Sequence, residues 1–137
     1  MSNKIRVIIV EPNKEPYTVK IKNTLEEKQN IVGGLIEFYE LEHSVDLIYN
    51  EESKILNLDF NRIIKNDIIC GTFIIVGQKN GYSISLSRKQ IQKYKKEFVL
   101  KKHKLAIDFL RTTLVNSYNL LDLNLSGVEQ LKKFLKK

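Results

Sequence analysis

Residues 4–22 read KIRVIIVEPNKEPYTVKIK, and this stretch decides the fold class. Its first seven residues are mostly β-branched, which predicts a strand buried in the middle of a sheet. Pro12 and Pro16 then mark a turn. From Tyr17 to Lys22 apolar and polar residues alternate, as expected of a strand that buries one face. The two segments together predict an antiparallel hairpin.

Beyond this hairpin, capping signals and apolar periodicity predict further strands and two helices. Thr24 fits the N-cap of a short helix that ends at Gly33-Gly34, and Ser87 fits the N-cap of a longer helix. Strands are expected at about residues 35–41, 45–49, 68–76 and 82–86. The short connections predict an α+β fold: a mainly antiparallel sheet of about five to six strands with one packed helix, followed by a C-terminal helical extension.

The segment 50–65 is the least regular part of the predicted sheet domain. We expect a loop over residues 50–54, brief strand pairing at 55–58 and a turn at 60–62. The apolar run that follows should be buried. We expect this run to begin as a helical turn before Gly71.

Charge is distributed unevenly along the chain. Residues 1–80 hold ten Lys and Arg against twelve Asp and Glu, a net charge of −2, whereas residues 81–137 hold thirteen against four, a net charge of +9. Such asymmetry is typical of a protein with an anionic partner. The chain also has 19 Lys, 17 Ile and 12 Asn, so AT-rich codon usage with a solvated helix face explains the same excess. The sequence leaves both explanations open.

The C-terminal part of the chain differs from the rest in pattern. We expect an α+β domain over residues 1–97 and a basic helical extension over residues 98–137. Apolar residues of the extension recur at helical spacing, beginning with Leu100, Ile107 and Leu110. A helix with such a stripe needs a partner to cover it. The helices of the extension can fold against each other, or one can pack on a second chain. The near-heptad spacing favours the second arrangement, a homodimer.

The composition argues against several classes of protein. No run approaches the roughly 18 apolar residues of a membrane span, so we expect no membrane association. The chain begins without a signal-peptide pattern, and we expect a cytoplasmic protein. It has one cysteine, Cys70, and no Cys/His spacing of a metal site, so we expect no metal and no cofactor. No catalytic constellation is visible, and we expect a binding protein and not an enzyme.

The densest group of polar residues in the first domain is a candidate site for a small ligand or a partner protein. On a loop carried by a rigid sheet, its carboxylates would accept hydrogen bonds from a base or ribose, and Arg62 would hold a phosphate through two hydrogen bonds. The alternative is structural: Asn50 caps a turn and Arg62 pairs with a glutamate. The group consists of Asn50, Glu51, Glu52, Lys54, Asn61 and Arg62.

The second candidate is a run of cations on the predicted C-terminal helices. A helix with these charges opposite its apolar residues can lie along a phosphate backbone. One interleaved aromatic, Tyr94, is not a stacking platform, and no motif of a sequence-specific reader is visible, so we expect contact without sequence readout. The predicted anion-binding residues are Arg88, Lys89, Lys93, Lys96, Lys101 and Lys104.

Several short motifs occur in an order and spacing that match a known family. They are Val10-Glu11-Pro12, Ile31-Val32-Gly33-Gly34 with Glu37, Tyr49-Asn50-Glu51-Glu52 with Lys54, Asn61-Arg62, the run from Asp67 to Gly77, and Ser87 to Ile91. Over residues 4–94 the chain resembles an uncharacterised domain family of phages, plasmids and conjugative elements, chiefly of Gram-positive hosts. The resemblance implies a mobile-element origin and supplies no activity.

Two hypotheses for function follow from these features. The mobile-element resemblance, the small size and the lack of a catalytic motif favour counter-defence, in which the protein inhibits a host immune effector or sequesters a small signalling nucleotide. The alternative is an accessory protein of a mobile element that binds nucleic acid through its basic tail. The expected partners are therefore a host defence protein or a small nucleotide in the bacterial cytoplasm, or nucleic acid, together with a second copy of the chain.

Overall fold

The computed structural model describes residues 3–65, 67–105 and 108. Its fold is the α+β fold predicted from the sequence, with a mainly antiparallel sheet and helices at the C-terminal end. In chain order the elements are β1 (Lys4–Val10), β2 (Tyr17–Lys22), α1 (Leu25–Val32), β3 (Ile36–Glu42), β4 (Val45–Asn50), β5 (Phe60–Ile64), β6 (Asp67–Cys70), β7 (Phe73–Lys79), β8 (Tyr82–Ile84) and α2 (Arg88–Glu97).

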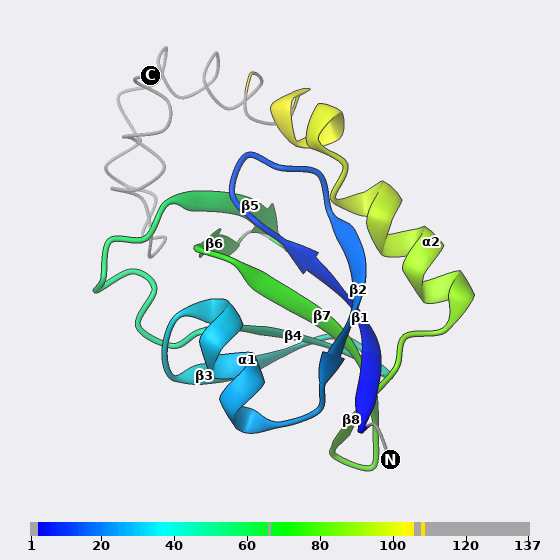
Figure 1. The fold of residues 1–137 in the computed structure, drawn as a ribbon. Helices are drawn as coiled ribbons and strands as arrows, with labels where there is room; N and C mark the ends of the chain where they lie inside the picture. Colours follow the sequence, from blue (N-terminus) through cyan, green and yellow to red (C-terminus); the bar gives the residue numbers. More distant parts are fainter. Residues whose placement is uncertain (1–2, 66, 106–107, 109–137) are drawn as a thin grey trace.

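The main sheet has six antiparallel strands. Five of them lie in the order β2-β1-β7-β4-β3, and β8 pairs with the end of β7. The sequence-adjacent hairpin β1–β2 therefore forms one side of the sheet, and β3–β4 forms the other. Strands β5 and β6 make a separate two-stranded sheet. The apolar run of β1 lies in the interior of the sheet, as its composition predicted (Figure 1).

The two faces of the sheet are covered by different elements. On one face, Val7 and Ile9 of β1 pack in a cluster with Val32 of α1, and this is called the α1 face. On the other face, Ile8 of β1 packs in a cluster with Tyr94 of α2 and with residues of the β5–β6 hairpin, and this is called the α2 face. Figure 1 shows α1 and α2 on opposite sides of the strands. Both helices bury apolar residues because each has one apolar stripe.

Both helix starts have the caps that the sequence predicted. The Thr24 side chain accepts a hydrogen bond from the backbone N–H of Glu27. Ser87 and Gln90 form a complete capping box, in which each side chain bonds the backbone N–H of the other residue. Gly33 ends α1 with a φ of 83°, a conformation that glycine adopts without steric cost.

The local predictions for the segment after β4 were wrong. Residues 60–62 begin strand β5 and are not a turn. Residues 55–57 belong to a turn, and residues 55–58 have no strand partner. The run before Gly71 is strand β6 and not a helical turn. Gly71 has a φ of 76°, and its N–H donates to the Asp59 carbonyl, so it bends the chain from β6 into β7. The sequence predicted a turn at Asn61 and Arg62 because the buried groups that they bond lie far away in the chain.

Packing on the sheet continues past Glu97, where we placed the end of the first domain. Phe98 is buried and meets Phe73 edge-to-face, with ring centroids 5.6 Å apart. His103 is buried against Phe60, with centroids 5.4 Å apart. The predicted stripe beyond residue 108, and with it the homodimer seam, lies outside the described residues. No helix in residues 3–65 or 67–105 is long and apolar enough to cross a membrane.

Candidate functional site

Asn50, predicted as part of a ligand-binding loop, is a buried cap. Its side-chain Nδ2 donates to the carbonyl of Val32 at the end of α1, 3.1 Å away. Its Oδ1 accepts from the backbone N–H of Glu52 at 2.7 Å. Asn50 therefore joins the C-terminus of α1 to the turn after β4, which is the structural alternative that the sequence left open. A Cβ at Gly34 would lie 3.0 Å from Asn50 Nδ2, so this close approach also needs glycine.

Arg62 is buried on β5, with 2% of its surface exposed. Nε and Nη2 donate to the carbonyl of Phe98 at 3.3 and 3.0 Å. Nη2 also donates to the carbonyl of Lys14 at 2.8 Å, and Nη1 donates to the backbone and side-chain oxygens of Asn61. These bonds use all five N–H groups of the guanidinium. A phosphate could bind Arg62 only by displacing the protein's own oxygens.

The environment of Arg62 is strongly desolvating. Burial lowers the pKa of its guanidinium, and the nearby Glu15 carboxylate acts in the opposite direction. Glu15 also accepts a hydrogen bond from the backbone N–H of Leu100. Arg62 thus satisfies a carbonyl at the end of α2, while Glu15 satisfies an amide at the start of the helical residues 100–105. The sequence analysis missed Glu15, because nothing local links it to Leu100.

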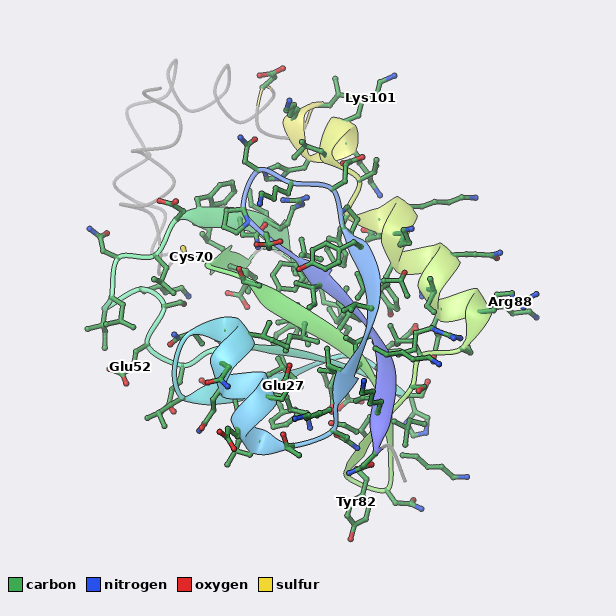
Figure 2. The ribbon with its side chains drawn as sticks, in the orientation of Figure 1. Glu27, Glu52, Cys70, Tyr82, Arg88 and Lys101 are labelled. Carbon is green, nitrogen blue, oxygen red and sulfur yellow. The ribbon has the colours of Figure 1, made fainter. Side chains whose placement is uncertain are left out.

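The six residues of the first candidate site do not surround one cavity. Asn61 lies beside Arg62 and donates to the carbonyls of Val10 and Gly71. Glu51, Glu52 and Lys54 lie instead in the turn after β4, beyond Asn50, where the two carboxylates are exposed. In Figure 2, Glu52 lies on the opposite side of the molecule from Arg88. The group thus divides into buried structural residues and an exposed turn.

The second candidate site, the run of cations on α2 and the helical residues after it, is exposed to solvent in the structure. All six predicted anion-binding residues are exposed, and so are two further cations of the same stretch, Lys95 and Lys102. Figure 2 shows Arg88 and Lys101 pointing away from the body of the molecule. At 3.6 residues per turn, Ile91, Tyr94 and Phe98 lie on the side of α2 that faces the sheet. The solvent-facing side carries Lys89, Lys93 and Lys96.

The charges at the start of α2 do not stabilise the helix, whereas Lys95 and Lys96 in its last turn suit the helix dipole. Its first turn contains Arg88 and Lys89 and no acidic residue, whereas the helix dipole favours anions at that end. Lys89 and Lys93 are four residues apart, and such like-charged pairs cost a few tenths of a kcal/mol. Among residues 3–65 and 67–105, the ion pairs of this stretch join Lys93 to Glu42 at 2.8 Å and Lys102 to Glu97 at 3.0 Å. Within that part of the chain, Arg88, Lys89 and Lys96 have no carboxylate partner, so they can act on an external anion.

A small cavity of about 260 Å³ lies between α2, β5 and the end of β3. Its polar wall is already bonded: Lys65 donates to the Leu41 carbonyl at 2.6 Å, and Glu42 accepts from Lys93. Burial raises the pKa of the Tyr94 hydroxyl, and its hydrogen bond to Glu42 adds to the effect. The volume is below the roughly 300–1,000 Å³ of ligand pockets. The cavity suits a small group better than a whole nucleotide.

Cys70, the single cysteine of the chain, does not have the surroundings of a nucleophile. Burial raises the pKa of the Cys70 thiol to about 11, which keeps it protonated and unreactive at neutral pH. Within residues 3–65 and 67–105, no group of three or more His, Cys, Asp and Glu side chains has the arrangement of a metal site.

One protein-family model matches most of the chain. A family model described as "Domain of unknown function (DUF3846)" matches residues 5–99, more than half of the 137-residue chain. The protein belongs to this family. The DUF3846 match ends just after Phe98, which is also where α2 is joined to β5 through Arg62. No curated protein and no solved structure is significantly similar to the chain.

Several motifs that carried the resemblance have backbone roles in this DUF3846 domain. Asn50, Asn61 and Arg62 bond main-chain groups from distant segments. A Cβ at Gly71 would lie 2.7 Å from Leu58 Cδ1, and one at Gly77 would lie 2.7 Å from the Ser85 carbonyl. These residues are therefore explained by the fold, and they do not identify a ligand.

Proposed function

We propose that the protein is a non-enzymatic binding protein of a mobile element that contacts the phosphate backbone of nucleic acid through α2. One observation carries this proposal: α2 concentrates exposed cations, and those of its first turn, Arg88 and Lys89, lie where the helix dipole disfavours positive charge. Charges that disfavour the folded state are commonly retained for a function. Phosphate contacts need lysine and arginine and no preformed pocket.

Helix α2 is also held firmly enough to present its charges in a fixed array. Its start is capped by Ser87. Its middle is tied to the β3–β4 turn, where Gln90 bonds Ser44 and Lys93 bonds Glu42. Its C-terminal carbonyl is bonded to Arg62. A helix fixed at three levels loses little further conformational freedom on binding, which favours affinity.

Fluorescence anisotropy with labelled nucleic acid of mixed sequence tests the proposal. Four phosphate contacts predict an affinity that falls about a hundredfold between 50 and 200 mM salt. The double variant Lys89→Gln/Lys96→Gln should lower the slope of log affinity against log salt by about two units. The matched control Lys14→Gln/Lys54→Gln removes the same charge from outside α2 and should keep the slope. If the wild-type protein does not bind at low salt, the proposal is lost.

Counter-defence is the second candidate, favoured by the cavity beside α2. Lys65 and Lys93 line this cavity. Their amino groups, once released from Leu41 and Glu42, would hold one phosphate group of a small signalling nucleotide, and the rest of the nucleotide would stay outside the cavity. The basic surface of α2 would equally fit an acidic patch on a host immune effector. Both versions place the protein in the cytoplasm of a bacterial host. Native mass spectrometry of protein purified from cells that carry the element would reveal a retained nucleotide or effector, and bare protein would count against both.

A further inference from the structure

Strands β1 and β2 carry a second group of cations, which the sequence analysis did not single out. The strand register places Lys4 opposite Lys22 and Arg6 opposite Lys20. Directly opposed residues of antiparallel strands lie on the same face of a sheet, so the four side chains form one block. All four are exposed. Among the described residues, no ion pair joins any of them to a carboxylate.

This block lies on the same face of the sheet as α2. Ile8, two residues after Arg6, packs in the cluster that contains Tyr94 of α2. Alternate residues of a strand share a face, so Lys4 and Arg6 lie on the α2 face, and their partners on β2 lie there with them. The backbone of Arg6 is also bonded to Ser85 Oγ and to the N–H of Leu86, both at 2.9 Å, just before α2 begins.

The orientation of α2 brings its free cations toward this block. One flank of the helix faces β3, because Gln90 bonds Ser44 and Lys93 bonds Glu42. Strand β2 is at the other edge of the sheet from β3. At about 100° per residue, Arg88 and Lys95 lie on the opposite flank from Gln90, on the side of β1 and β2. The free cations of α2 and those of β1 and β2 therefore lie on the same side of the sheet and toward the same edge.

The cross-strand pairs are unfavourable in the isolated protein. Like charges directly opposite each other destabilise a sheet by up to roughly 1 kcal/mol. Two such pairs follow each other along β1 and β2, and the first turn of α2 is also basic. Positive charges therefore repel one another in both places. An anion bound across both elements would reduce this repulsion.

We propose that β1 and β2 form the second half of the interface and that the ligand is double-stranded nucleic acid. This inference rests on the proposed function of α2. Two separate groups of cations on one surface match the two phosphate strands of a duplex. A single strand offers one line of phosphates and depends on aromatic stacking. Tyr82 is 75% exposed at the tip of the β7–β8 hairpin (Figure 2), and a single ring stacks one base.

The experiment compares a 24-base-pair duplex and a 24-nucleotide single strand of mixed sequence by fluorescence anisotropy across salt concentrations. Three full-length variants are measured beside the wild type. Arg6→Gln/Lys20→Gln changes the strand block, Lys89→Gln/Lys96→Gln changes α2, and Lys14→Gln/Lys54→Gln removes two charges elsewhere. Melting temperatures within about 2 °C of wild type confirm that each variant is folded, as expected where the substituted positions are exposed or, at Lys54, partly buried.

The expected result is that the wild type binds the duplex at least tenfold more tightly than the single strand. The strand-block and α2 variants should each lower the duplex salt slope by about two units, and the third variant should not. A strand-block variant that binds like the third variant, while the α2 variant is weakened, overturns this inference and leaves the proposed function standing. Equal or tighter single-strand binding overturns the duplex assignment. If no variant changes binding, both proposals fail.

Discussion

Arg62 on β5 and Arg88 on α2 are the same residue type in opposite surroundings. Arg62 is 2% exposed, and its five N–H groups are all bonded to oxygens of the protein. Arg88 is exposed at the start of a helix, where the helix dipole disfavours a cation. The fold depends on the first guanidinium and tolerates the second. Arg88 is therefore the one available to a partner.

The contrast shows why residue type alone does not distinguish a ligand-binding residue from a structural one. A polar cluster in a short sequence window looks like a binding loop whether its partners are ligand atoms or distant main-chain carbonyls. The partners of Arg62 come from the β1–β2 turn, at Lys14, and from the end of α2, at Phe98. Those contacts exist only in the folded chain, where Arg62 joins β5 to the β1–β2 turn and to the end of α2.

The largest expected effect is on Arg62. Arg62→Ala should lower the free energy of unfolding by about 3 kcal/mol or more, because it removes the Arg62 donors of the buried Phe98 carbonyl and of the partly buried Lys14 carbonyl. Arg88→Ala makes the same chemical change at an exposed site and should alter stability by less than about 0.5 kcal/mol. Urea denaturation followed by circular dichroism measures both. Similar midpoints for the two variants would show that the Arg62 network does not hold the fold.

A smaller effect concerns the junction beyond α2, where His103 is stacked on Phe60. Burial, followed by the charges of Arg62 and Lys104, lowers the pKa of His103 to about 4. An unfolded histidine has a pKa near 6.5. Between these values the unfolded chain takes up a proton that the folded chain does not, so stability falls as the pH falls. His103 alone should remove about 1–2 kcal/mol between pH 7 and pH 5.

His103→Phe separates this effect from the other titrating groups. The variant keeps an aromatic ring against Phe60 and has no proton to gain, while His43 and the carboxylates are the same in both proteins. The difference in unfolding free energy between the two proteins should therefore shift in favour of the variant by about 1–2 kcal/mol from pH 7 to pH 5. Parallel stability curves would mean that His103 is not the residue responsible.

The fold was predictable where local signals decide it. The β-branched run of β1, the alternation of β2 and the caps at Thr24 and Ser87 all act within a few residues, and the structure has each of them. Predictions for residues 55–62 were wrong because tertiary contacts decide that segment. Asn61 and Arg62 sit in a strand whose buried polar groups are satisfied from β1, β6–β7 and α2.

The basic surface was predictable in part, for a related reason. Helical spacing shows from sequence alone which side of α2 is exposed, so its cations were found. Lys4 and Arg6 looked like flanking residues of a buried strand, and Lys20 and Lys22 looked like the polar half of an alternating strand. Whether these four cations form one block on the same face as α2 depends on the β1–β2 register and on which face α2 covers. A hairpin prediction with an assumed register would have suggested the pairs.

The smallest expected effect decides whether these cations serve binding or reflect codon usage. Lys20→Gln removes one charge opposite Arg6 and should stabilise the fold by about 0.2–0.5 kcal/mol at low salt. The gain should vanish in 1 M salt, where the Debye length is about 3 Å. Lys14→Gln, in the turn, should show no such salt-dependent gain.

Under the binding proposal, Lys20→Gln should also weaken duplex binding several-fold, since a phosphate contact is lost. A stabilised variant that binds the duplex as well as wild type would assign the charge to codon usage, and a variant destabilised at low salt would show that the cross-strand repulsion is not there.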